Sequence, residues 1–598
     1  ILSTVKNLLL MDMRKNRFTI FFFFFCALFN FSKNLNAAST SPSQTVPKVL
    51  EDIEKEKIKK RDNQELLKGL ENTKIKRDQM EQISVIVNSI VVIASKELQN
   101  IINFDIYKKQ LVNKSSTINE LNMIANSMTK DYQSKDFPLV RVILPKQELK
   151  KEGATVFFKV INGFIEKINL EKVPKVQRKS VFRYLREIKD KKNLKNSLLE
   201  KKLLLASQVA GLKLNTAFAP GAKEGATILV VEAKHKLFSG SINFNNTQSE
   251  ELGRQLGVLQ TTINSPFGYG EGLTMFGLAR PTIKGMKGTG NSVTIRGGGL
   301  SFSYPLGDNG LITNLSYSES MTRPGGDIAS LGIESNMKSG SLGLTYPLKL
   351  STNSSWTLRG NITWIDELQQ TNTTGIDQIL SHDRLTSLRL GLSFFGCPNG
   401  CIYFDSELSR GIDVASRSAS EATDIPLSRT SGTSQYHHIR INSSYSFYVL
   451  TNYLMKIGFG GQFTDDALLN SEQSTVIGMD KISSLTSGAI SGDKVWYVRA
   501  ELNRTFSLLD NLSMTPYLYS AMGVAYLNRP TTAENKETAA KSLGVGLQLN
   551  NINDYFYFNK NITAKIEYSK TIATDKIEIL SDVRLNKHHL MLMLNMDF

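Results

Sequence analysis

The amino-acid sequence predicts a transmembrane β-barrel of about 16 antiparallel strands over residues 236–598, preceded by two small α/β domains and an N-terminal helix. Three observations predict this fold. Segments of alternating polar and apolar residues recur roughly every 20 residues after residue 235, as expected for strands between lipid and a polar lumen. The alternation continues to an aromatic end at Phe598. An apolar segment typical of an export signal lies ahead of both parts.

The distribution of charge divides the chain in two. Its 598 residues carry a formal net charge of +17, which by itself would point to a nucleic acid or an anionic surface. Residues 236–598 contain 30 basic and 31 acidic residues, whereas residues 38–235 contain 37 and 23. Because the basic excess lies ahead of the barrel, we expect no nucleic-acid partner. The mean hydropathy of −0.19 excludes a membrane protein of many helices, since each span needs about 20 mostly apolar residues.

Residues 1–37 are interpreted as a signal peptide with an upstream extension. Basic residues after Met11 precede an apolar run of 14 residues, Phe18–Phe31, and small residues follow at Ala37 and Ala38. The run is short for a bilayer span and suits the core of a signal peptide. A membrane-anchoring helix is the alternative.

Residues 38–82 are predicted to form a charged helix and a linker. Leucine, isoleucine and valine recur between residues 48 and 80 at roughly helical spacing among many charged residues. This pattern is typical of an amphipathic helix with a large polar face. A solvated linker is the alternative for the later part.

A repeated order of elements predicts two similar α/β domains, at 83–163 and 164–235. The first has strands near 85–93, 138–144 and 154–161, with helices near 96–106 and 117–133. The second has strands at 164–170, 213–218 and 226–232, with helices near 178–188 and 197–210. A duplicated β-α-α-β-β unit of roughly 70–80 residues indicates tandem domains.

Arg141–Leu149 and Gly153–Ile168 resemble a known domain. The first segment, RVILPKQEL, joins a hydrophobic strand to Pro-x-Gln, and the second, GATVFFKVINGFIEKI, places a glycine before each of two strands. This order resembles the POTRA domain of two-partner secretion translocators, the TpsB family with its ShlB-, FhaC- and HecB-like members. Ala219–Val231 is similar to the end of the family's second POTRA domain. Asp136 stands where the family usually has glycine.

The barrel region shows the same resemblance around its large sixth loop. Ser491–Leu502 is similar to the strand that follows this loop in the family. In relatives the loop carries Val-Arg-Gly-Phe/Tyr, and its Arg pairs with an Asp of the barrel. The aligned residues here are Val476, Ile477, Gly478 and Met479, and the partner position is Ala521. Both charges are absent together, which costs less than the loss of one partner of a buried pair.

Cys397 and Cys401 flank a Pro-Asn-Gly turn in the barrel region. In an oxidising compartment two such cysteines are expected to form a local disulfide across a hairpin. A zinc site is the alternative, but it would need two further ligands nearby, and none is adjacent.

The resemblance implies an outer-membrane translocator of a Gram-negative bacterium. It would export one large unfolded partner exoprotein of the TpsA type, such as an adhesin, a haemolysin or a haem-binding protein, from the periplasm to the cell surface. The two POTRA domains would bind this client in the periplasm, the barrel would be its conduit, and the helix of 38–82 would plug the resting pore. An assembly factor of the BamA superfamily, which inserts other proteins into the outer membrane, is the alternative function.

Candidate client-binding residues lie on two strands suited to β-augmentation by an extended chain: Leu139, Arg141, Ile143, Leu214, Thr216 and Phe218. Three basic residues, Arg183, Arg186 and Lys189, are predicted to face an acidic client, although simple solvation also explains such residues. Phe598 resembles the C-terminal signal that the barrel-assembly machinery reads. The expected partners are thus the client, outer-membrane lipid and that machinery, for a chain that acts as a monomer.

We expect no catalytic residues, no metal site and no cofactor. The six histidines, at 235, 382, 437, 438, 588 and 589, show no metal-ligand spacing such as H-x-x-x-H. Neither a G-x-S-x-G elbow nor a phosphate-binding G-x-x-x-x-G-K-[ST] loop occurs. A hydrolase that assembles a Ser-His pair from distant strands is the enzymatic alternative.

Overall fold

The computed structural model describes residues 84–150, 153–249, 251–281, 295–372, 377–418, 424–509, 512–532, 534–550, 561–572 and 588–598. The expected signal peptide at 1–37 and the expected helix and linker at 38–82 lie outside these residues. Among the described helices, none is both long and apolar enough to cross a bilayer.

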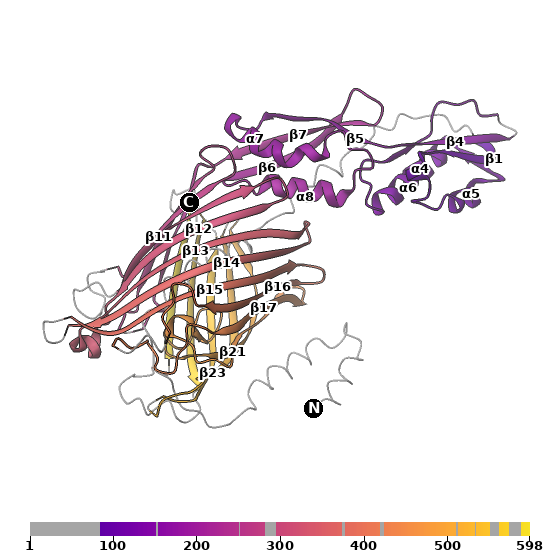
Figure 1. Cartoon of the computed structure of the whole chain (residues 1–598). Coiled ribbons are helices and arrows are strands. Elements are labelled where there is room, and N and C mark those ends of the chain that lie inside the picture. The colour runs from indigo at the N-terminus through magenta and orange to yellow at the C-terminus, as the bar shows by residue number, and fades with distance from the viewer. Residues whose placement is uncertain are drawn as a thin grey trace.

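The first α/β domain is a four-stranded sheet with helices packed against it (Figure 1). Its strands are β1 (Ser84–Ile93), β2 (Lys114–Thr117), β3 (Arg141–Ile143) and β4 (Ala154–Ile161), in the spatial order β2-β1-β4-β3. Its helices are α4 (Lys96–Gln99), α5 (Asp105–Leu111) and α6 (Ile118–Ser134). Helix α6 begins with a capping box between Thr117 and Glu120, and Tyr132 on its buried face donates a hydrogen bond to the Leu98 carbonyl at 2.7 Å.

The sequence-based prediction was wrong in two details of this domain. The single helix expected near 96–106 is divided into α4 and α5, because the side-chain oxygen of Asn103 accepts a hydrogen bond from the N–H of Asp105 at 3.0 Å and forms a turn there. Strand β2 was not predicted. It follows Asn113, whose left-handed backbone (φ 60°) reverses the chain so that β2 pairs with β1.

The second α/β domain repeats this plan with a three-stranded sheet. Its strands are β5 (Phe164–Lys172), β6 (Leu212–Pro220) and β7 (Ala226–His235), in the order β5-β7-β6. Its helical segments are η3 (Lys175–Gln177), α7 (Arg178–Leu185), η4 (Arg186–Ile188) and α8 (Asn196–Ser207). Apolar side chains of α7 and α8 pack on the sheet, and Val181, Leu185, Leu203 and Leu229 are fully buried in this core.

A closed antiparallel barrel of 16 strands follows. The strands are β8 (Phe238–Asn245), β9 (Leu256–Asn264), β10 (Gly272–Ala279), β11 (Ile295–Leu306), β12 (Leu311–Thr322), β13 (Ile333–Leu350), β14 (Ser354–Thr371), β15 (Gln378–Gly396), β16 (Cys401–Ile412), β17 (His437–Leu450), β18 (Tyr453–Phe463), β21 (Lys494–Asn503) with its continuation β22 (Phe506–Leu509), β23 (Leu512–Tyr526), β24 (Glu537–Asn550), β25 (Asn561–Ile572) and β26 (His588–Asp597). The barrel closes where Met593–Asp597 of β26 pairs with Ser241–Asn245 of β8. The predicted fold class is therefore confirmed.

The two faces of the barrel wall differ as the alternation predicts. On β14, Arg359, Ile365 and Glu367 point inward and are buried, whereas Ile362 is exposed on the outer face. The closed wall pairs its backbone groups internally, so that strands can cross lipid without exposed hydrogen-bonding groups. Wall height varies around the barrel, because β8, β9 and β10 have 8, 9 and 8 residues and β14 and β15 have 18 and 19.

The lengths of the connections between strands distinguish the two ends of the barrel. Short turns such as Gly307–Gly310 and Ser351–Asn353 lie at the end that meets the second α/β domain, and longer connections lie at the other end (Figure 1). If the second α/β domain lies in the periplasm, as the resemblance implies, the short turns are periplasmic and the long connections are extracellular.

Candidate functional site

Both strands predicted to accept a client are edge strands of their sheets. Strand β3 is the last strand of the order β2-β1-β4-β3, and β6 is the last of β5-β7-β6. Arg141 and Ile143 on β3 are exposed, whereas Leu139 lies just before β3 and is partly buried against the core of the second domain. On β6, Leu214 is buried, and Thr216 and Phe218 are half-buried. A strand at the end of a sheet can accept an extended chain through main-chain hydrogen bonds, and this geometry suits an unfolded client.

Two of the three basic residues predicted to face a client contact the barrel. Arg186 forms an ion pair with Asp308 in the turn between β11 and β12, at 2.8 Å. Arg183 donates a hydrogen bond to the Tyr269 carbonyl in the turn between β9 and β10, at 3.0 Å. The sequence does not show that these barrel turns come within reach of α7, and the role of both residues toward a client stays a prediction. Lys189 lies outside the junction, next to Asp190.

Further residues that the sequence-based prediction missed strengthen this junction. Lys202 of α8 is almost completely buried and donates hydrogen bonds to the Asp308 carbonyl at 2.9 Å and to Asn309 Oδ1 at 3.1 Å. Its ammonium group also pairs with Glu187 at 2.8 Å. The hydrogen bond from Lys202 lowers the pKa of Glu187, and the hydrogen bond from Arg186 lowers the pKa of Asp308. The second α/β domain is thus attached to the barrel by charged contacts.

The lumen of the barrel contains loop 6, the connection between β18 and β21 (residues 464–493). It includes η7 (Asn470–Glu472) and the short pair β19 (Ser474–Thr475) and β20 (Ser491–Gly492). Loop 6 contacts the inner wall on several sides, from Arg389 of β15 to His589 of β26, whose Nδ1 lies 2.9 Å from the Ser483 carbonyl oxygen. The loop therefore crosses the lumen, in the path that a client would take.

The residues aligned with the family's loop motif lie in an apolar cluster against the wall. Val476 and Ile477 are buried together with Ala521, Tyr497 and Tyr519. Ile477 and Ala521, the two positions that the sequence comparison aligned with the motif Arg and its partner, are thus part of one apolar cluster. Gly478 and Met479 follow at the edge of this cluster and are half-buried.

A polar contact next to this cluster also joins loop 6 to the wall. It involves Arg499 of β21 and not the positions aligned with the motif. Arg499 of β21 forms an ion pair with Glu567 of β25 at 2.8 Å and stacks on the Tyr519 ring. Arg499 also donates hydrogen bonds to Ser483 Oγ at 2.9 Å and to the Lys481 carbonyl at 3.1 Å. Ser483 in turn hydrogen-bonds Glu567. This contact was missed because its members are far apart in sequence and no periodicity links them.

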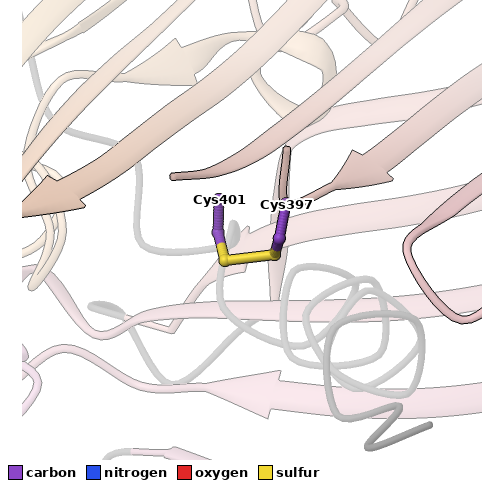
Figure 2. Close-up of a disulfide and its surroundings, with 2 residues drawn as sticks. All are labelled: Cys397 and Cys401. Carbon is purple, nitrogen blue, oxygen red and sulfur yellow. A yellow bond between two sulfur atoms is a disulfide. The ribbon is translucent and has the colours of Figure 1, made fainter. Parts of the chain in front are cut away.

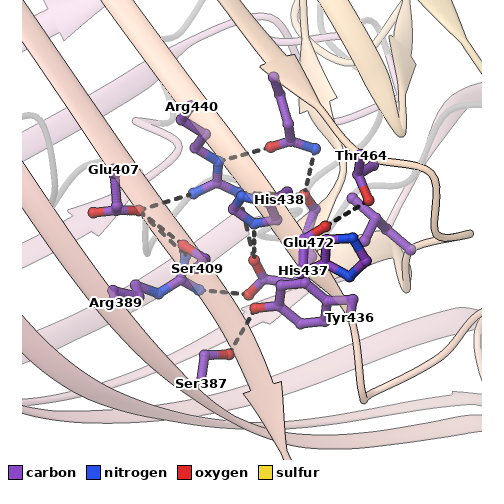
Figure 3. Close-up of polar contacts among 12 residues, drawn as sticks. Ser387, Arg389, Glu407, Ser409, Tyr436, His437, His438, Arg440, Thr464 and Glu472 are labelled. Atoms are coloured by element: carbon purple, nitrogen blue, oxygen red, sulfur yellow. Dashed lines mark hydrogen bonds and ion pairs between the residues drawn. The ribbon is translucent and has the colours of Figure 1, made fainter.

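A second polar anchor of loop 6 is a buried carboxylate, Glu472 (Figure 3). Its Oε1 accepts a hydrogen bond from Arg389 of β15 at 2.6 Å. Its Oε2 lies 3.1 Å from His438 Nε2 and 3.4 Å from Arg440 Nη2, both on β17. Burial alone would raise the pKa of Glu472, but the charge of Arg389 and the contacts with His438 and Arg440 hold it well below its usual range. Loop 6 therefore supplies the anion and the wall supplies the cations.

A third anchor ties the end of loop 6 to the preceding extracellular loop. Asp493 is fully buried and pairs with Arg429, which lies between β16 and β17, at 2.8 Å. Asp493 also accepts a hydrogen bond from the Leu468 N–H at 3.0 Å, at the other end of loop 6. These contacts close the base of the loop.

The remaining predicted residues lie on the barrel itself. Cys397 and Cys401 form a disulfide across the periplasmic turn between β15 and β16 (Figure 2). Phe598 lies at the seam, where its N–H and carbonyl exchange hydrogen bonds with Gly240 of β8 at 2.9 and 2.8 Å. Within the described residues, no group of three or more His, Cys, Asp or Glu side chains is arranged to hold a metal ion.

The chain is similar to known secretion proteins over most of its length. The family model described as haemolysin secretion/activation protein ShlB/FhaC/HecB matches residues 224–549. The heme/hemopexin transporter protein HuxB of Haemophilus influenzae (strain 86-028NP) is 21% identical over 461 residues, which cover 75% of this chain and 78% of HuxB. The outer membrane transporter CdiB of Dickeya dadantii is 22% identical over 404 residues, covering 66% of this chain and 67% of CdiB.

The architecture agrees with a solved structure of the same group. CdiB from Escherichia coli superposes with a TM-score of 0.68 at 17% sequence identity, over 94% of this chain and 100% of that chain. At this identity the likeness shows the fold, whereas the family model covers more than half of the sequence. The protein belongs to the ShlB/FhaC/HecB family of outer-membrane haemolysin secretion and activation proteins, the two-partner secretion transporters.

Proposed function

We propose that this protein exports one large, unfolded partner exoprotein of the TpsA type through its barrel, from the periplasm to the cell surface. The observation that carries the proposal is the closed barrel whose lumen is crossed by loop 6 on ionic anchors, with two α/β domains at its periplasmic entrance. A permanent open pore would not need such anchors, whereas a conduit that opens for a client does.

The two α/β domains act as POTRA domains that bind the client. An extended client segment adds to the edge of β6 or β3, where main-chain pairing tolerates many sequences. The residues at these edges are Leu139, Arg141, Ile143, Leu214, Thr216 and Phe218. Among the basic residues, Lys189 faces the client. Arg183 and Arg186 contact the barrel turns and so help to attach the domain to the barrel.

The client belongs to the adhesin, haemolysin or haem-binding class. HuxB is named as a heme/hemopexin transporter, and the family is described by haemolysin secretion and activation. We extend this to the present chain: its client is a secreted exoprotein that folds outside the cell, so that folding helps to draw the chain outward.

The other parts of the chain have supporting roles in this proposal. Residues 1–37 direct export, residues 38–82 plug the resting pore, residues 83–163 and 164–235 are the POTRA domains, and residues 236–598 are the conduit. Phe598 is read by the barrel-assembly machinery, the outer wall contacts membrane lipid, and the protein acts as a monomer without enzymatic activity. The pairing of Phe598 with Gly240 at the seam supports a role in closing the barrel.

Deleting the gene tests the proposal against its main alternative. We expect one large protein to disappear from the culture medium, measured by quantitative proteomics of medium and outer membrane, while the outer-membrane profile stays unchanged. A general loss of outer-membrane barrels would instead assign the protein to membrane-protein assembly.

A second experiment tests where the client binds. A photo-crosslinking amino acid at Asn215, exposed on β6, should capture the client during secretion, and the same group at Lys179, exposed on α7, should not. Equal crosslinking at both positions would contradict binding at the sheet edge.

A further inference from the structure

The outer wall of the barrel carries a groove between two rows of outward side chains. The registers of β13 to β18 align six residues in one continuous row: Leu344, Gly360, Leu390, Leu408, Ile439 and Phe463. Leu344, Leu390 and Leu408 in this row are about half exposed, at 48%, 52% and 56%. Since this face of the wall meets the membrane, lipid covers the row.

A second row runs beside the first and changes character along its length. Its members, in register from β13 to β17, are Leu342, Ile362, Leu388, Arg410 and His437. The first three are exposed aliphatic residues, and the last two carry basic groups. We call the space between the two rows the wall groove.

Glycine creates the space in this groove. Gly360 stands in the first row between Leu344 and Leu390, and a Cβ placed on it would meet no atom within 4 Å. The cavity that the two rows enclose has a volume of about 750 Å³ and is lined mainly by apolar atoms. A volume of this size accommodates a hydrocarbon chain.

The groove rises along the wall from its middle to its extracellular end. Leu342, Ile362 and Leu388 lie midway along β13, β14 and β15. Arg410 lies two residues before the end of β16, and His437 is the first residue of β17, next to the extracellular loop. From β13 to β17 the groove spans roughly 19 Å at about 4.8 Å per strand. Its apolar part thus faces the membrane interior, and its basic part faces the headgroup layer of the outer leaflet.

The basic end offers a cation for a phosphate group. Among the described residues, Arg410 forms no ion pair or side-chain hydrogen bond, and its row neighbours are Leu388 and His437. Asp466, a carboxylate at this end, is engaged by His437, with 2.8 Å between Nδ1 and Oδ2. The guanidinium group of an arginine binds phosphate oxygens through two parallel N–H donors.

We infer that the wall groove is a binding site for a phosphorylated glycolipid of the outer leaflet, with an acyl chain along the two rows and a phosphate on Arg410. The apolar and basic parts of the groove follow the same order as the parts of the ligand. The acyl chain lies toward the middle of the wall, and the phosphate lies at its extracellular end. The site is separate from the lumen, and it does not depend on the proposed export function.

Lipid retention by the purified protein tests this site. The full chain is reconstituted in nanodiscs with hexa-acylated lipid A that carries both phosphates or with the same lipid dephosphorylated, and retained lipid is counted by native mass spectrometry. We expect the wild type to retain the phosphorylated form with about fivefold preference, because one arginine near an anionic surface contributes an effect of this size. The preference should be lost in Arg410→Gln. Gly360→Leu fills the groove and should lower retention of both forms.

Two matched variants serve as controls. Arg296→Gln removes another exposed arginine at the extracellular end of β11, outside the groove, and Gly277→Leu fills a second open glycine position on β10. Neither should change retention, and all variants are checked for folding by the heat-modifiable migration of the barrel in gels. Equal retention of the two lipid forms by the wild type, an equal effect of Arg296→Gln, or stronger retention of phosphatidylglycerol than of lipid A would overturn the assignment.

Discussion

Glu472 shows how much depends on one side chain in the lumen. Its carboxylate is enclosed by Arg389, His438 and Arg440, and it is the loop's contribution to an ion pair that joins loop 6 to β15 and β17. Removing one partner of a buried pair costs about 3–5 kcal/mol, because the charges left behind remain buried. Loop 6 should therefore respond strongly to changes at this position.

In Glu472→Gln we expect loop 6 to leave the lumen more often, by roughly a hundredfold if about 3 kcal/mol is lost. Single-channel recordings in planar bilayers measure this as a higher fraction of open time. Asp405→Asn is the matched control, because Asp405 pairs with Arg359 within the wall and does not contact loop 6. An equal effect of both variants would contradict a specific role of Glu472.

The low pKa of Glu472 gives a pH prediction with a definite sign. A carboxylate whose pKa is lower in the folded than in the unfolded state stabilises the folded state at pH values above its unfolded pKa, which is 4.5 here. This stabilisation is lost only as the pH falls through the folded-state pKa. The anchor should thus be unchanged between pH 7 and pH 5. Open time that rises steadily over this interval would show that another group controls the loop.

The disulfide and the junction act at the scale of elements. Cys397 and Cys401 close a very short loop on a hairpin whose strands β15 and β16 are already paired over eleven residue pairs. The disulfide thus constrains little that the strand pairing does not constrain already.

We expect the double variant Cys397→Ser/Cys401→Ser to fold and to lose at most about 2 kcal/mol, the chain-entropy limit for so short a loop. The temperature at which the barrel loses its compact migration in gels measures this, with the reduced wild type as a control. Failure of the variant to reach the outer membrane would show that the disulfide is needed during assembly.

The junction between α8 and the turn after β11 should be more sensitive. Lys202→Met removes a buried cation that bonds Asp308, Asn309 and Glu187, at a cost of about 2 kcal/mol for hydrogen bonds to a charged group. Spin-label distances between the second α/β domain and the barrel should broaden. Lys179→Met, on the exposed side of α7, should leave them narrow. Unchanged distances in Lys202→Met would mean that the apolar contacts suffice.

At the scale of the whole molecule, the plug proposal is tested by removing residues 38–82. We expect a larger single-channel conductance and continued secretion, since the client-binding strands and the barrel remain. Combining this deletion with Glu472→Gln should increase the open fraction further, because the two act independently. Unchanged conductance after the deletion would defeat the idea of a plug.

The barrel and the tandem domains were predictable because their signals are local. Period-two alternation, short turns and a repeated element order can be read from neighbouring residues. The anchors of loop 6 were not predictable, because Glu472 lies 83 positions from Arg389 and Ser483 lies 84 positions from Glu567. The contacts of Arg183 and Arg186 were not predictable for the same reason: the barrel turns that they contact are distant in sequence.

The uneven wall also affects the membrane around it. A tilted strand needs about 9–11 residues to cross the hydrocarbon layer, and β8, β9 and β10 have 8, 9 and 8. On this side, next to the seam with β26, we expect the bilayer to become thinner to match the short strands, while β14 and β15 pose no such demand. The protein therefore sits in an asymmetric annulus of lipid, with the greatest compression of the bilayer beside the pair of strands that closes the barrel.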